Sequence, residues 1–338
     1  MALSKKVNCP IFIVGCPRSG TTLLRDLLQS HPHLAFPTES NFIPQFYRAF
    51  GDPKDATDAE RLANRILNLF WVKCWELDLD PADFREDRRF AEMIDRLYGA
   101  FAAHRGKIRW GDKTPMNVMH IPTLVEIFPQ AKVIHIYRDG RDVALSWLPF
   151  HAGPGNLYTA ALGNLYTAAL LWRETIRAGE YARQTLPSST YMQVRYEDLI
   201  TDVSGIMKTI CDFVDEPYND AVTTPTRSPY DNTPGLFKPR RNPRVAEQTV
   251  ISQNALKWKT KMSRTDRILF ESVAQAELDA LGYEIEGVTR PISSTQRLAW
   301  KASHILTKLF ESLNRTCKHQ WVPSHLMIRY ANLKAKLH

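Results

Sequence analysis

The segment most able to do chemistry is GCPRSGTT, residues 15–22, which separates a predicted strand from a predicted helix. Its two glycines have the spacing of a phosphate-binding loop, and Thr21 and Thr22 stand where such a loop carries Lys and Ser or Thr. The N–H groups of a helix start attract an anion, and Gly20 lets the backbone approach it closely. Because Arg18 adds a planar cation, the segment predicts a site for a phosphate or sulfate group. A glycine turn without a ligand is the alternative.

The loop lacks the lysine that a nucleoside triphosphatase places on the β- and γ-phosphates. Such an enzyme also needs an acidic residue near a strand end to hold magnesium, yet Arg138 follows the predicted strand 131–137. We expect no metal, since no His, Cys or Asp cluster has ligand spacing. A P-loop nucleotide or small-molecule kinase and a non-catalytic nucleotide-binding protein remain as alternative functions.

Two segments resemble sulfotransferases that use 3′-phosphoadenosine 5′-phosphosulfate (PAPS). GCPRSGTTLLR resembles the family's 5′-phosphosulfate loop, and VIHIYRDGRDVALSW, Val133–Trp147, resembles its 3′-phosphate segment. The resemblance implies that Ser19–Thr22 hold the 5′-phosphosulfate, while Arg138 and Ser146 converge on the 3′-phosphate of the donor. Taken alone, RDGRD is equally a charge cluster at a helix start.

Three further segments extend the resemblance, which covers roughly Pro10 to Tyr283: WGDKTP at 110–115, VRYEDL at 194–199 and LKW at 256–258. They imply that Lys113 is a cation near the transferred group, that Tyr196 lies near the nucleotide and that Lys257 closes over it. A salt bridge of Lys113 with Asp112 or a neighbour, and a buried structural Tyr196, are the alternatives.

Glu39 is the candidate general base, and Arg18 and Lys113 are the candidate cations at the reacting centre. Cytosolic sulfotransferases often have Lys in the slot of Arg18 and a His base, whereas HPHLAFPTES resembles the tyrosylprotein branch, in which a glutamate follows the second strand. We expect the first two strands to be adjacent and parallel, so that their carboxyl ends meet in one crevice and Arg18 and Glu39 can face each other. Glu39 is alternatively an acid at a helix start. His31 and His33 are competing bases, or shape a turn.

These residues must be positioned by an α/β fold, because predicted strands alternate with predicted helices. We expect a three-layer fold with a mainly parallel central sheet and a P-loop-kinase-like phosphate loop, which is the sulfotransferase fold. The predicted strands are residues 10–15, 34–36, 107–110, 131–137 and 190–195. The predicted helical segments are residues 20–30, 56–104, 116–128, 140–150, 160–184 and 197–214.

The composition is that of a globular protein, with 338 residues of which 44% are apolar. No window approaches 18 uninterrupted apolar residues, and the first eight residues are too polar for a signal peptide. The five cysteines are scattered without a CxxC pair, which argues against a disulfide framework. We expect a cytoplasmic protein acting on a small-molecule, carbohydrate or lipid acceptor.

The net charge of +8 is concentrated in residues 291–338, which carry eight Lys or Arg and one acidic residue. Residues 1–290 carry 36 basic and 35 acidic side chains, so we expect no nucleic-acid partner. We predict a sulfotransferase domain at 1–290 and a basic helical extension at 291–338. Its apolar stripe at 297–315 is suited to an anionic membrane or a partner, or to packing on its own domain or a dimer mate.

Two other segments have no assigned chemistry. The octapeptide GNLYTAAL occurs twice in tandem, at 155–162 and 163–170, either near the mouth of a site or as a neutral lengthening of one helix. Residues 219–255 are rich in Pro, Asn, Thr and Arg and are typical of a long loop, often a lid.

Overall fold

The structure is a computed structural model that describes residues 9–37, 39–151, 165–226 and 254–287, together with Ser293 and Thr295. It contains two compact units. Unit 1 comprises the described chain up to Gly15, Gly20–Ile136 and the described chain from Gly179 to residue 226. Unit 2 comprises Cys16–Ser19, Tyr137–Ala178 and the described chain from Asn254. The first octapeptide copy, the 297–315 stripe and most of the 219–255 loop lie outside the described residues.

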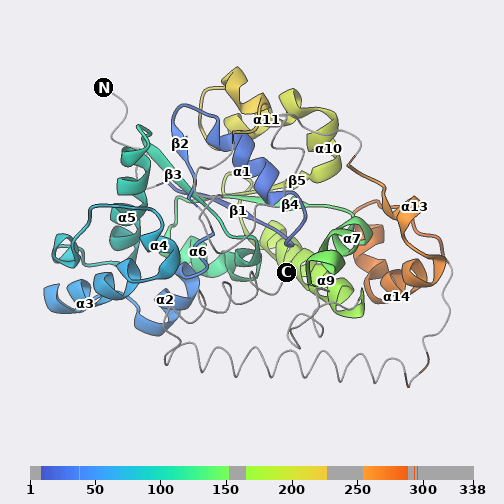
Figure 1. The fold of residues 1–338 in the computed structure, drawn as a ribbon, viewed down its shortest axis with the longest axis horizontal. Coiled ribbons are helices and arrows are strands. Elements are labelled where there is room, and N and C mark those ends of the chain that lie inside the picture. Colours follow the sequence, from blue (N-terminus) through green and yellow to red (C-terminus); the bar gives the residue numbers. More distant parts are fainter. Residues whose placement is uncertain are drawn as a thin grey trace, which may run out of the picture. The chain divides into compact units, whose positions relative to one another are not determined.

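Unit 1 is built on a five-stranded sheet in the order β2-β3-β1-β4-β5 (Figure 1). The pairs β1–β3, β1–β4 and β2–β3 are parallel, which confirms the α/β prediction. All four side chains of β1, IFIV, are buried, as expected of a central strand with both faces covered. The strands are β1 (Ile11–Val14), β2 (Leu34–Ala35), β3 (Arg109–Lys113), β4 (Lys132–Tyr137) and β5 (Tyr191–Arg195).

The expectation that the first two strands are neighbours is wrong, because β3 lies between β1 and β2. β3 also begins later than predicted and continues to Lys113. Lys107 precedes the strand, and its ammonium group donates hydrogen bonds to the carbonyl oxygens of His31 and Leu34, at 3.0 and 2.8 Å. The strand that carries Lys113 is therefore the direct neighbour of the strand that leads to Glu39.

The helices of unit 1 flank the sheet, with α1 packed against β1 and α5 against β3. The predicted helix at 116–128 is instead a 3-10 helix followed by α6, which begins with Pro122 in its first turn. The elements are α1 (Thr21–Gln29), α2 (Ile43–Phe50), α3 (Ala56–Leu67), α4 (Phe70–Lys73), η2 (Pro81–Phe84), α5 (Phe90–His104), η3 (Pro115–His120), α6 (Ile121–Ile127), α10 (Tyr196–Thr201), α11 (Val203–Phe213) and η4 (Asp220–Thr223).

Aromatic rings fix α5 on β3. The Tyr98 ring lies 4.6 Å from the Trp110 ring and 4.9 Å from the Trp75 ring, between centroids. Trp110 also meets Phe12 of β1 edge-on at 6.0 Å, and its indole N–H donates to Asp95 at 2.7 Å. Because buried aromatic rings contribute much of a core's packing energy, this cluster holds the end of β3 in a defined place.

Unit 2 contains α7 (Gly140–His151), most of α9 (Leu165–Thr185), α13 (Trp258–Lys261) and α14 (Arg264–Ala280). Its core includes Trp172, Trp258 and Phe270. Residues 165–170 of the second octapeptide copy form the first turns of α9, and Leu165 and Ala169 are buried in this core.

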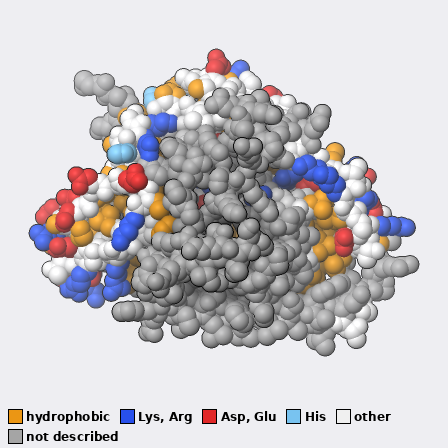
Figure 2. Space-filling model, in the orientation of Figure 1, with side chains coloured by type: hydrophobic (Ala, Val, Ile, Leu, Met, Phe, Trp, Pro, Cys, Tyr) orange, Lys and Arg blue, Asp and Glu red, His pale blue; other side chains and the backbone are white. Residues whose placement is uncertain are grey.

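The surface over α3 and η2 carries acidic and basic side chains side by side, as Figure 2 shows at the left of the view. Arg85, which ends η2, pairs there with Glu60 of α3 at 2.7 Å. This mixture agrees with the near balance of charge in residues 1–290. Among the described residues, no helix combines the length and the apolar character needed to cross a membrane.

Candidate functional site

The start of α1 has the features of an anion site. Gly20 is its N-cap with φ of 103°, no side chain caps the helix, and no acidic residue stands in the first turn. Thr21 is buried and Thr22 is exposed. A Cβ at Gly20 would lie only 2.3 Å from Cδ2 of Tyr196, the buried first residue of α10. Glycine is therefore required here by both the backbone conformation and the packing of Tyr196.

The rest of the phosphate loop, Cys16–Ser19, belongs to unit 2. The Ser19 hydroxyl is fully buried and has no hydrogen-bond partner among the described residues. A buried hydroxyl without a partner is costly, so this group fits a ligand that supplies an acceptor oxygen. Cys16 instead packs in the unit 2 core, where burial raises the pKa of its thiol to about 12 and makes it a poor nucleophile.

Arg18 connects the two predicted nucleotide segments within unit 2. Its Nε–H donates to the Ser146 hydroxyl at 3.0 Å, although the two residues are 128 positions apart. Arg18 is exposed and has φ of 76°, a left-handed conformation that is unusual for a residue with a side chain. Backbone strain of this kind is concentrated at functional sites, which favours a binding role for Arg18.

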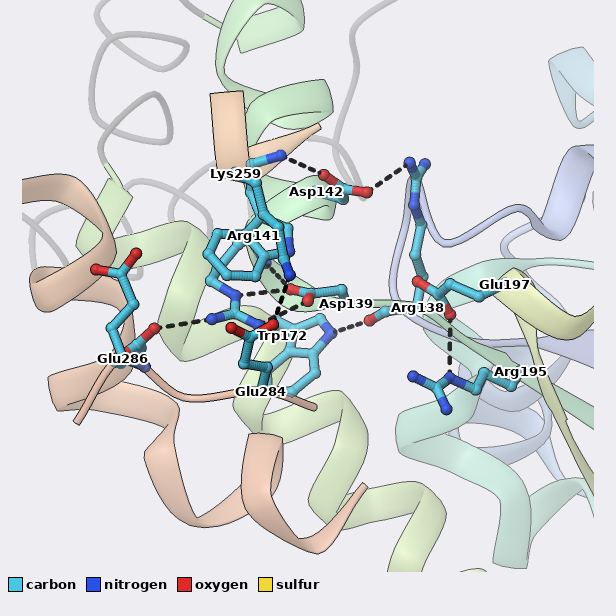
Figure 3. A network of polar contacts seen from close by, with 12 residues as sticks. Arg138, Asp139, Arg141, Asp142, Trp172, Arg195, Glu197, Lys259, Glu284 and Glu286 are labelled. Atoms are coloured by element: carbon cyan, nitrogen blue, oxygen red, sulfur yellow. Dashed lines mark hydrogen bonds and ion pairs between the residues drawn. The ribbon is translucent and has the colours of Figure 1, made fainter. Parts of the chain in front are cut away.

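Arg138 directly follows β4, as predicted, but its observed partners were not expected (Figure 3). Its Nη2 donates to Asp142 Oδ2 at 3.2 Å and to the Asn254 carbonyl oxygen at 2.5 Å. The other Asp142 oxygen accepts the Trp258 N–H at 2.9 Å. Arg138 and Ser146 thus lie in one unit, and the Ser146 hydroxyl accepts a hydrogen bond from Arg18.

Lys257 is brought into the same unit by this network. It is the half-buried N-cap of α13, between Leu256 with φ of 57° and the buried Trp258. Trp258 stacks on the guanidinium of Arg141, whose carbon lies 3.5 Å from the ring centroid. Arg141 is itself fully buried and pairs with Asp139 at 2.8 Å (Figure 3). It also pairs with Glu271 at 2.8 Å. The second arginine of RDGRD is therefore a structural residue that holds α13.

Glu39 and Lys113 form an ion pair in unit 1, with Nζ and Oε1 2.5 Å apart. The Lys113 side chain is 4% exposed and that of Glu39 is 44% exposed, so the carboxylate remains accessible. The alternative for Lys113 is a surface salt bridge with Asp112 or a neighbour; Lys113 does form a salt bridge, but it is buried and its partner is Glu39. Glu39 also precedes α2 by several residues, and the first turn of that helix holds no acidic residue.

His31 and His33 lie in the turn that precedes β2. His31 is fully buried, and burial lowers its pKa. Its Nδ1 accepts the His33 backbone N–H at 3.1 Å, and its Nε2 lies 2.9 Å from the Pro217 carbonyl oxygen. Both nitrogens of His31 are thus occupied within the protein, which favours the turn-shaping role over that of a base.

His31 and His33 also lie close to Glu216, with their potential ligand atoms within 4.8 Å, a grouping that sequence spacing did not indicate. The Glu216 oxygens are occupied by His33 at 2.8 Å and by Arg109 at 3.1 Å. The cluster therefore ties the start of β2 to the turn after α11.

Sequence reasoning missed two acidic residues beside the predicted ones. Asp142 follows Arg138 by four residues, a helix spacing that does indicate an ion pair. Asp112 accepts a hydrogen bond from Ser40, which is 72 residues away, and no signal in the sequence indicates that contact.

Comparisons with known proteins bear on the family and the fold. A protein-tyrosine sulfotransferase of Drosophila melanogaster is 27% identical over 217 residues, which cover 63% of this chain and 39% of that protein. The match therefore spans about two fifths of that relative.

Two solved structures share the fold. They are a sulfotransferase domain from the olefin synthase of Synechococcus PCC 7002 and one from the curacin biosynthetic pathway. Their TM-scores are 0.55 and 0.56 at 24% and 21% identity. Each match covers 83% of this chain, and 97% and 100% of those domains. Residues 10–220, well over half of the chain, match the model of the sulfotransferase family, and the chain therefore belongs to that family.

Proposed function

We propose that this protein transfers a sulfuryl group from PAPS to a hydroxyl or amine of an acceptor that is a small molecule, a carbohydrate or a lipid. Membership of the family supports the reaction class over the kinase and the non-catalytic alternatives. No metal takes part in the proposed reaction, because arginine and lysine side chains carry the positive charge that it needs.

Residues of the two nucleotide segments hold the donor in this proposal. Ser19–Thr22 bind the 5′-phosphosulfate through backbone N–H groups and hydroxyls, and Arg138 and Ser146 bind the 3′-phosphate. Tyr196 and Lys257 complete the nucleotide site. The buried Ser19 hydroxyl without a partner and the uncapped start of α1 support this assignment, because both lack the acceptor that an anionic group provides.

The observation that carries the mechanism is the Glu39–Lys113 pair, which joins an accessible carboxylate to a buried ammonium. PAPS supplies the sulfuryl group, and adenosine 3′,5′-bisphosphate leaves as the acceptor oxygen or nitrogen forms its bond to sulfur. Glu39 takes the proton that the acceptor loses. Lys113 and Arg18 neutralise the negative charge that develops on the oxygens around sulfur, and the ion pair that holds Glu39 against Lys113 reduces the reorganisation required.

Replacing Glu39 by Gln tests the mechanism, because the amide keeps the shape and loses the basicity. We expect turnover to fall by about 10²–10⁴-fold, the usual contribution of a positioned base. The acidic limb of the rate–pH profile flattens, while calorimetric affinity for adenosine 3′,5′-bisphosphate stays unchanged. Glu126→Gln is the matched control, because that carboxylate lies elsewhere in unit 1 and bonds to Tyr47.

The assay follows the transfer of labelled sulfate from PAPS to 4-methylphenol, which is a weakly acidic phenol. 4-Nitrophenol, a much stronger acid, recovers part of the rate lost in Glu39→Gln, because it reaches the site already ionised. Near-wild-type turnover of Glu39→Gln would overturn the mechanism. A parallel incubation with a metabolite extract and with a tyrosine peptide identifies the acceptor class, and label in the peptide alone contradicts the class proposed above.

We also propose that residues 1–290 form the catalytic domain and that the basic extension 291–338 contacts a membrane surface or a second protein. A cytoplasmic setting completes the proposal. The cysteines of the described chain, Cys9, Cys16, Cys74 and Cys211, are free thiols, which supports a reducing compartment.

A further inference from the structure

The position of Glu39 is not set by the sheet. β2 pairs with β3 only at Leu34 and Ala35, opposite Arg109 and Trp110. The ladder therefore ends four residues before Glu39, and a further contact has to hold the chain in register with the end of β3.

That contact is made by the next residue. The Ser40 hydroxyl donates to Asp112 Oδ1 at 2.8 Å, and both residues are almost fully buried. Asp112 and Lys113 are successive residues of β3, so their side chains leave the strand on opposite faces. Glu39 and Ser40 are also successive, and they contact Lys113 and Asp112 respectively. Residues 39 and 40 thus contact the end of β3 on both of its faces.

The Asp112 side chain, which accepts the Ser40 hydrogen bond, is itself held in place by further hydrogen bonds. Its Oδ1 also accepts the Tyr98 hydroxyl at 3.0 Å, and its Oδ2 accepts the Asn117 amide at 3.3 Å. Tyr98 is itself held by the rings of Trp75 and Trp110. A side chain bonded from three elements cannot change rotamer without breaking several buried hydrogen bonds, so its place is well defined.

We propose that Ser40 and Asp112 are positioning residues, whose hydrogen bond holds the Glu39 carboxylate against Lys113. This inference rests on the proposed function, in which Glu39 is the base. Without the bond, the polar contacts that residues 39 and 40 make with β3, among the described residues, reduce to the ion pair of the exposed Glu39 carboxylate with Lys113. A displacement of about 1 Å at a reacting group costs on the order of 10²-fold in rate.

The test compares Ser40→Ala with Ser30→Ala, using PAPS and 4-methylphenol. Ser30 is a matched control because its hydroxyl also makes internal hydrogen bonds in unit 1, to Thr224 O at 2.6 Å and to the Thr226 hydroxyl at 2.8 Å. We expect Ser40→Ala to lower kcat by about 10–100-fold. We also expect it to shift the acidic limb of the pH profile and to leave calorimetric affinity for adenosine 3′,5′-bisphosphate unchanged. Ser30→Ala should keep kcat within about threefold of the wild-type value, even if its melting temperature falls as far as that of Ser40→Ala.

Conservative variants separate positioning from folding. Ser40→Thr retains the hydroxyl and restores most of the turnover, and Ser40→Cys, with a weaker donor, falls between Thr and Ala. If the kcat values of Ser40→Ala and Ser30→Ala instead follow their melting temperatures, Ser40 is only structural and the inference is wrong.

A double-mutant cycle separates this inference from the proposed function. Ser40→Ala in the Glu39→Gln background should cause no further loss, because the group being positioned is already absent. Loss of activity in Glu39→Gln together with full activity in Ser40→Ala overturns the positioning role and leaves the base intact. Full activity in Glu39→Gln overturns both.

Discussion

Two roles of Arg138, one proposed and one structural, should be separable by combining two substitutions. We propose it as a ligand of the donor's 3′-phosphate, and in the structure it also neutralises Asp142 and bonds to the Asn254 carbonyl oxygen. Replacing Arg138 by Ala should therefore reduce both nucleotide affinity and the stability of the fold.

The two losses differ in size. The Asp142 side chain is 0% exposed, so Arg138→Ala leaves a buried carboxylate with the Trp258 N–H but without its cation. Breaking a buried ion pair in this way costs about 3–5 kcal/mol of stability. The lost contact to phosphate is worth about 1.5–3 kcal/mol, or roughly a 10–150-fold weaker affinity for adenosine 3′,5′-bisphosphate. Adding Asp142→Asn removes the unpaired buried charge. The double variant should therefore be more stable than Arg138→Ala, while its affinity for adenosine 3′,5′-bisphosphate should stay as low.

Urea unfolding measures the first loss, and calorimetry on folded protein measures the second. Adenosine 5′-phosphate, which lacks the 3′-phosphate, should bind Arg138→Ala and wild type equally well. Arg177→Ala is the control, since it removes a surface arginine of unit 2 that pairs with Glu277 at 2.7 Å. Equal weakening of both nucleotides would refute the assignment of Arg138 to the 3′-phosphate.

Two further predictions concern metal and acid. Transfer to 4-methylphenol should survive excess EDTA, because side-chain cations carry the charge, and inhibition that magnesium reverses would contradict this. Burial lowers the pKa of His135 to about 4, from 6.5 in the unfolded chain. As the pH falls from 6.5 to 4, the unfolded chain binds a proton that the native state does not. Stability should therefore decrease by about 3 kcal/mol over this range and then level off. Urea unfolding at a series of pH values should show this decrease in wild type and not in His135→Gln, and parallel curves would disprove it.

The phosphate loop and its flanking elements were predictable from the sequence because they depend on neighbouring residues. An apolar β-branched run formed β1, and the glycine that the loop needs at its left-handed position stands directly before α1. The family resemblance likewise rested on short contiguous segments, and the match over residues 10–220 confirms it. Alternation of strands and helices was enough to predict the α/β class.

Strand order was decided only by the tertiary structure. Local propensity forms a strand but does not determine its neighbours, which depend on how distant helices pack on the sheet. Placing β3 between β1 and β2 brought Lys113 to Glu39 and Asp112 to Ser40, across more than 70 residues of chain. The contact between Arg138 and the Asn254 carbonyl oxygen likewise joins segments that are far apart in the sequence. The sequence alone thus determined which residues could do the chemistry, whereas the packing of distant segments decided which of them lie together, because those contacts form only when the whole core is assembled.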